Sequence, residues 1–177
     1  MIALETVNHL VGAATVAMQL AAITVLGAYL MRGTSDRAGA IAASVGRWGI
    51  WAGFLLTLGA AAMSLFYSDV LGIEPCPLCW WQRVCMFPQV VLFAMALWKP
   101  DPRVADHSIA LSGIGLAIAL YHHALQVLPS GSLPCPAVGV SCAQRIIFEF
   151  GYVTFPLVAA TLFSLLIVLM LFVRKQR

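Results

Sequence analysis

Five long apolar stretches dominate this chain and restrict what it can fold into. They cover residues 10–31, 48–71, 80–98, 109–128 and 152–173. A helix of about 20 apolar residues crosses the roughly 30 Å hydrocarbon core of a bilayer. With 62% apolar residues and a mean hydropathy of +0.94, the chain has too few charged side chains to cover a soluble domain of its size. We therefore expect an all-α membrane protein with five transmembrane helices.

The basic residues predict how these helices are oriented. Threading five spans places eight basic residues on one side of the membrane: Arg32, Arg37, Arg47, Lys99, Arg103, Arg174, Lys175 and Arg177. Only Arg83 and Arg145 fall on the other side. Because positive charge accumulates in the cytoplasm, we expect an extracytoplasmic N-terminus and a cytoplasmic C-terminus. The basic residues form no stripe that could follow a phosphate backbone, so nucleic acid is not an expected partner.

The strongest local motif is Cys76-Pro77-Leu78-Cys79, followed by Trp80-Trp81-Gln82-Arg83. Pro77 suits the first turn of a helix, which places Cys79 near the outer end of the third span. The helix dipole and Arg83, four residues later, would stabilise a thiolate on Cys79. The alternative is an inert disulfide with Arg83 extended toward the lipid headgroups.

A second cysteine pair, Cys135 and Cys142, lies in a loop on the same predicted side. Alone, the pair is compatible with either a structural clamp or a redox-active disulfide. Two pairs that face one oxidising compartment can exchange with each other. Cys85 lies inside the third span without a partner on its side, and we expect it to be buried as a small apolar residue.

Two further expectations concern the fourth span and the loop that follows it. His122 and His123 are ionisable groups within a span, so they are functional candidates. Adjacent residues on a helix point about 100° apart, so we expect one functional and one packed histidine. The loop over residues 129–151 is rich in Pro and Gly and should be irregular, with one or two helical turns at residues 145–150 in the membrane interface.

Taken together, these motifs resemble the DsbB/BdbC family of membrane thiol oxidoreductases. The resemblance rests on the run at residues 74–83, Met86-Phe87-Pro88, Tyr121-His122 with Gln126, and Cys135 to Cys142. The short second cysteine loop is similar to the compact BdbC-like branch. The resemblance covers roughly residues 47–173. Residues 1–46, with the first span, have no counterpart in the four-helix family pattern, and Cys85 is also additional.

The resemblance implies a four-helix catalytic bundle at residues 47–177, preceded by an extra helix and cytoplasmic loop at residues 1–46. Such a bundle binds a quinone, ubiquinone or menaquinone, and reoxidises a DsbA/BdbD-like thioredoxin-fold oxidase outside the cytoplasm. By position, the partner attacks Cys135 and Cys142 is its resolving mate, while Cys142 exchanges with Cys76. Cys79 then meets the quinone. The implied quinone contacts are Cys79, Gln82, Arg83 and His122, and no metal is implied.

This resemblance predicts a thiol:quinone oxidoreductase of the bacterial inner membrane that uses the membrane quinone pool. Two alternatives stay open. A vitamin K epoxide reductase-like enzyme would share the bundle and cysteine pairs, although the Cys-x-x-Cys-x-x-Gln-Arg run argues against it. A metal transporter could use the cysteines as thiolate ligands, because soft metals favour Cys and His. A transporter would bind metal stoichiometrically and would not depend on quinone.

Overall fold

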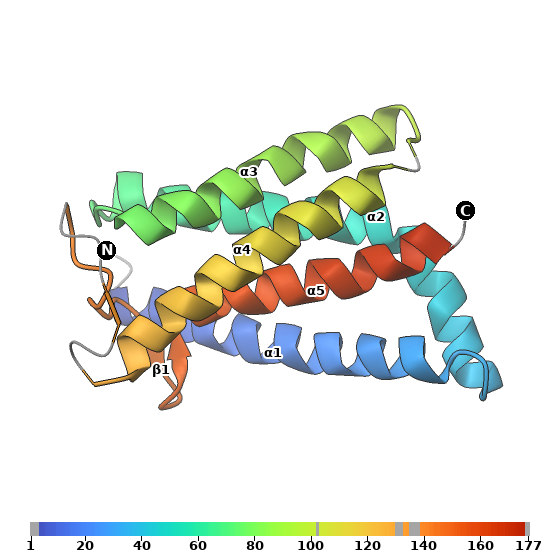
Figure 1. Cartoon of the computed structure of the whole chain (residues 1–177), viewed down its shortest axis with the longest axis horizontal. Coiled ribbons are helices and arrows are strands. Elements are labelled where there is room, and N and C mark those ends of the chain that lie inside the picture. The colour runs from blue at the N-terminus through green and yellow to red at the C-terminus, as the bar shows by residue number, and fades with distance from the viewer. Residues whose placement is uncertain (1–3, 102, 130–132, 135–138, 176–177) are drawn as a thin grey trace.

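Five long helices form the part of the protein that the structure describes (Figure 1). The computed structural model describes residues 4–101, 103–129, 133–134 and 139–175. The helices are α1 (Leu4–Met31), α2 (Asp36–Leu65), α3 (Pro77–Trp98), α4 (Val104–Val127) and α5 (Phe155–Lys175). Within the described residues, α1, α2 with its continuation, α4 and α5 are long and apolar enough to cross a membrane. The prediction of an all-α membrane protein is confirmed.

Helix α3 lacks a stretch as apolar as those in the other four described helices. Its 22 residues would extend about 33 Å at 1.5 Å per residue, enough to span the hydrocarbon core. It carries Gln82, Arg83 and Gln89, and both glutamines are buried in the bundle. Because α3 packs between α2 and α4, these polar groups find partners inside the protein and need not contact lipid.

Helix α2 is longer than hydropathy predicts. It begins at Asp36, twelve residues before the expected span, so Arg37 and Arg47 lie on the helix and not in a loop. The added segment is rich in Ala, a strong helix former, while its charges lower its hydropathy. At its other end α2 continues as a π-helical turn, η1 (Phe66–Val70).

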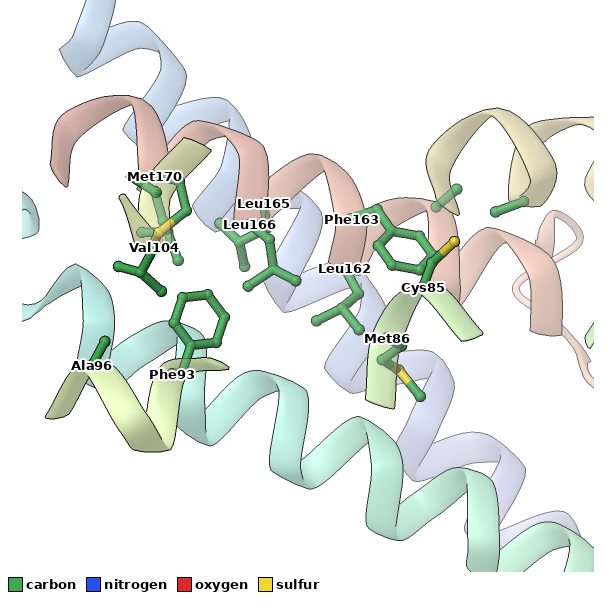
Figure 2. Close-up of a cluster of buried hydrophobic side chains, with 14 residues drawn as sticks. Cys85, Met86, Phe93, Ala96, Val104, Leu162, Phe163, Leu165, Leu166 and Met170 are labelled. Carbon is green, nitrogen blue, oxygen red and sulfur yellow. The ribbon is translucent and has the colours of Figure 1, made fainter. Parts of the chain in front are cut away.

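The core is organised around α5. This helix lies between α1 and α4 in Figure 1 and also packs against α2. Figure 2 shows side chains from Leu162 to Met170 in a cluster with Met86 and Phe93 of α3. Small residues allow close packing: a Cβ on Gly53 would stand 2.8 Å from the Phe93 ring. Such contacts are typical of membrane bundles, where close packing replaces the hydrophobic drive for association.

The prediction of helical turns at residues 145–150 is wrong. The chain instead forms a short antiparallel hairpin, with β1 (Phe148–Glu149) paired to β2 (Val153–Thr154). Its turn contains Phe150 and Gly151 at φ values of 52° and 75°. Gly adopts this left-handed conformation without steric cost, so the chain reverses there and cannot continue a helix.

The two ends of the bundle are formed by different segments of the chain. The N-terminus of α1, the start of α3, the end of α4 and the hairpin share one end, whereas the turn between α1 and α2 and the C-terminus share the other (Figure 1). The segments that carry Cys76 and Cys142 therefore meet at a single end of the molecule.

Candidate active site

The first cysteine pair lies where α3 begins. Pro77 occupies the first turn of the helix, where its missing amide proton costs no hydrogen bond. Cys76 is the N-cap residue, and its sulfur accepts a hydrogen bond from the backbone N–H of Cys79 at 3.4 Å. The two Sγ atoms are 2.9 Å apart. The Cys-Pro-Leu-Cys sequence thus places both sulfurs at a helix N-terminus, where the dipole favours negative charge.

The two thiols of this pair differ in their surroundings. Cys76 is buried, whereas Cys79 is half-buried. The hydrogen bond with Cys79 and burial raise the pKa of the Cys76 thiol to about 12, against a smaller opposing effect of His122. Cys76 therefore keeps its proton at neutral pH, and a negative charge in the pair resides on the Cys79 sulfur.

His122 of α4 connects the first pair to the second cysteine segment. Its Nε2 atom lies 3.7 Å from the Cys76 sulfur and 3.0 Å from the carbonyl oxygen of Cys142. Its Nδ1 atom lies 3.0 Å from the amide nitrogen of Gln82. A carbonyl only accepts and an amide nitrogen only donates, so the proton of a neutral His122 is on Nε2. The ring is thus held between α3 and the loop after α4.

Gln126, one turn after His122, binds the same loop. Its Nε2 atom donates to the carbonyl oxygens of Cys142 at 3.2 Å and Gln144 at 2.9 Å. In return, Nε of Arg145 donates to the Gln126 carbonyl oxygen at 2.7 Å. The Cys142 side chain is only 1% exposed. Helix α4 therefore fixes the Cys142 segment beside the first pair.

Arg83 is held by a neighbouring helix. Its Nε atom donates to the Ser64 hydroxyl and a terminal nitrogen donates to the Ser64 carbonyl, each at 2.8 Å. Its guanidinium carbon also lies 5.1 Å from the centre of the Trp80 ring, within cation–π range. These contacts hold the half-buried charge against α2, in contrast to an arginine that extends freely to the headgroups.

These groups line one cavity of about 320 Å³. Its polar lining includes Cys76, Cys79, Gln82, Arg83 and His122. Much of the remaining wall consists of apolar side chains from α1, α2 and α5. A small-molecule site typically combines apolar walls with a few convergent polar groups. The residues present therefore fit a redox-active ring that carries an apolar tail, as a quinone does.

The same residues include a possible set of metal ligands. Within the described part of the chain, the ligand atoms of Cys76, Cys79 and His122 lie within 4.8 Å of one another. Two thiolates and an imidazole suit soft ions. However, Nε2 of His122 already carries a proton toward the Cys142 carbonyl, so metal binding there would break the link between the two cysteine segments.

The structure brings together the predicted site residues that it describes. These are Cys76, Cys79, Gln82, Arg83, His122 and Cys142. Cys135 lies outside the described residues. His123 lies on a different face of α4, where its Nδ1 atom is 2.7 Å from the Thr154 hydroxyl. Cys85 is buried in the helix core, as predicted.

Two contributors to the site had no role assigned to them from the sequence. Gln126 belongs to the motif that resembles the family, and its four-residue spacing from His122 places both on one helix face. That spacing was a usable signal. Ser64 offered none, because its contact with Arg83 joins two helices and no local pattern encodes it.

Comparisons with known proteins agree with this arrangement. The family model described as disulfide bond formation protein DsbB matches residues 46–173. Probable disulfide formation protein C 1 of Bacillus cereus is 42% identical over 63% of this chain and 77% of its own length. A probable disulfide formation protein C of Halalkalibacterium halodurans is 37% identical over 70% of this chain and 91% of its own.

Disulfide bond formation protein C of Bacillus subtilis is 33% identical over 72% of this chain and 94% of its own length. No solved structure matches the chain significantly. The family match covers most of the sequence and includes all helices except α1 and the first part of α2. The chain therefore belongs to the DsbB family and is a membrane oxidoreductase of disulfide bond formation.

Proposed function

We propose that this protein oxidises the dithiol of an extracytoplasmic, DsbA/BdbD-like thioredoxin-fold oxidase and passes the electrons to a membrane quinone, either ubiquinone or menaquinone. One observation carries the proposal. The Cys79 sulfur lines a largely apolar cavity that is also lined by Arg83 and by the Cys142 segment. A thiol pair thus lies between a cavity that suits a lipid-soluble acceptor and the segment that carries Cys142.

The electron route starts at the second cysteine pair. A partner thiolate attacks Cys135 of a Cys135–Cys142 disulfide, which forms a mixed disulfide and releases the Cys142 thiolate. The second partner thiol then displaces Cys135, so the partner leaves as a disulfide. The reduced Cys135 and Cys142 next reduce a Cys76–Cys79 disulfide by the same exchange. Each complete dithiol–disulfide exchange transfers two electrons and two protons.

The burial of Cys142 supports this order. At 1% exposure its sulfur is closed to a large protein partner, whereas it lines the same cavity as the first pair. Cys142 is therefore suited to exchange with Cys76. The partner thiolate therefore attacks Cys135, the other cysteine of the second pair.

The final acceptor takes up two electrons and two protons, and this is the chemistry that a bound quinone supplies. The protein's own residues prepare the transfer. Cys79 presents its sulfur to the cavity, and Cys76 retains a proton because its pKa is raised. Arg83 contributes a fixed positive charge, while Gln82 and His122 supply polar groups beside the sulfurs.

An anaerobic assay tests the proposal. Purified protein in lipid nanodiscs, given a reduced thioredoxin-fold oxidase, should convert added quinone to quinol, followed by its ultraviolet absorbance. Cys79→Ala should abolish the conversion. A partner whose second cysteine is replaced by Ala cannot displace Cys135, so it should accumulate as a mixed disulfide with Cys135, identified by mass spectrometry. Trapping of the partner on Cys76 would contradict the proposed route.

The metal alternative has a separate readout. Extraction of the purified protein with organic solvent should release a quinone that mass spectrometry identifies. Stoichiometric bound metal without quinone, together with no quinone reduction, would support a thiolate-dependent transporter in place of the oxidoreductase route.

A further inference from the structure

Helix α1, which lies outside the family match, is attached to the site end of the bundle by buried polar contacts. Nδ2 of Asn8 donates to the Ile146 carbonyl oxygen at 3.0 Å, and the Tyr67 hydroxyl donates to Oδ1 of Asn8 at 2.6 Å. Asn8 therefore joins α1 to η1 and to the loop that carries Cys142. Both the nitrogen and the oxygen of its side-chain amide therefore have a hydrogen-bond partner.

A second set of contacts lies three turns further along α1. Nε2 of Gln19 lies 3.3 Å from the Thr161 hydroxyl of α5, and the Tyr152 hydroxyl donates to Oε1 of Gln19 at 2.8 Å. Unpartnered polar groups are costly in hydrocarbon, so two such attachments fix the rotation of α1 about its axis. The face that α1 turns toward the bundle is therefore defined.

The adjoining face of α1 forms part of the cavity wall. Val11, Ala14 and Met18 line the cavity, and their spacing of three and four residues places them on one face. Ala14 is exposed although it lines the cavity, and so is Leu55 of α2. The cavity is thus open at its apolar side, beside Ala14 of α1 and Leu55 of α2.

We infer that α1 is a specificity element that binds the apolar tail of the quinone and forms one side of the opening toward the bilayer. This inference rests on the proposed function. The polar groups that suit the redox ring come from α3 and α4, whereas α1 offers the cavity only apolar side chains. Contact with α1 therefore distinguishes quinones by their tails and not by their rings.

A matched pair of substitutions tests the inference. Ala14→Leu fills space at the cavity wall, whereas Ala13→Leu adds the same volume at an exposed position that does not line the cavity. For each variant, KM is measured with a quinone that carries an apolar tail and with one that has none. In Ala14→Leu the KM for the tailed quinone divided by the KM for the tailless quinone should rise about tenfold. Displacing about two tail methylenes from the cavity costs this much affinity. Ala13→Leu should keep the wild-type ratio.

A direct binding measurement separates this inference from the proposed function. A quinone with a photoreactive group at the end of its tail should crosslink to α1 in the wild-type protein, with the site mapped by mass spectrometry. Crosslinks confined to other helices, or equal KM ratios in both variants, would overturn the role of α1. Crosslinking to α1 without any quinone reduction would instead refute the proposed function and leave the binding role intact.

Discussion

Arg83 illustrates how a single charge is positioned at the site. Ser64 accepts two hydrogen bonds from its guanidinium, one at the hydroxyl and one at the carbonyl. The group therefore occupies a fixed place on the cavity wall, four residues after Cys79. A preorganised charge of this kind stabilises negative charge on a neighbouring sulfur or ligand without reorganisation at the moment of transfer.

Replacing Arg83 by Met should weaken quinone binding about tenfold, the effect expected when one charge-assisted hydrogen bond is lost. Arg83→Lys keeps the positive charge but lacks the planar guanidinium group. Its affinity for quinone should therefore fall between those of the wild type and the Met variant. Quinone titration of purified protein measures both affinities, and thermal unfolding verifies that the bundle is intact. Full affinity in the Met variant would remove Arg83 from the site.

The sequence predicts those parts of the site whose residues lie close together along the chain. Cys76, Cys79 and Arg83 lie within eight residues on one helix start, so helical geometry places them together. The bonds from Arg83 to Ser64 and from His122 to the Cys142 carbonyl cross between elements. These partners follow from how the helices pack, which composition and spacing do not specify.

At the scale of elements, hydropathy located all five helices but not their limits. Charges interrupt the apolar pattern at the Ala-rich start of α2, so the pattern predicts a loop where the structure has a helix. At residues 145–150 apolar and charged residues alternate at a spacing that predicts helical turns, yet Gly151 reverses the chain. The hairpin matters for function because it completes the loop between α4 and α5 that presents Cys142.

The attachment of this loop to α4 by Gln126 yields a prediction. Gln126→Leu removes the donor to the Cys142 and Gln144 carbonyls and preserves side-chain size. Oxidation of the partner should slow about tenfold, because a lost hydrogen bond costs roughly 1–1.5 kcal/mol in positioning. Quinone reduction driven by a small dithiol at Cys76 and Cys79 should stay unchanged. Stopped-flow absorbance measures both rates, and an equal loss in the two assays would contradict a positioning role.

At the scale of the whole molecule, the two ends of the bundle differ in charge. The end with the α1–α2 turn and the C-terminus carries Arg32, Arg103 and Arg174, and the Arg174 side chain pairs with Asp106 at 3.0 Å. The cysteine end carries only two Lys or Arg side chains among the described residues, Arg83 and Arg145. Both are held by hydrogen bonds within the bundle.

This asymmetry predicts the orientation of the protein in its membrane, with the cysteine segments outside the cytoplasm. Positive charge is retained on the cytoplasmic side during insertion, so the α1–α2 turn should be cytoplasmic. In a cysteine-free background, Thr34→Cys places a thiol at that turn and Ala143→Cys places one in the Cys142 loop, both at exposed positions. A membrane-impermeant maleimide should label only Ala143→Cys in intact spheroplasts and should label both after permeabilisation. Labelling of Thr34→Cys from outside would reverse the orientation and place the disulfide chemistry in a reducing compartment, where it could not persist.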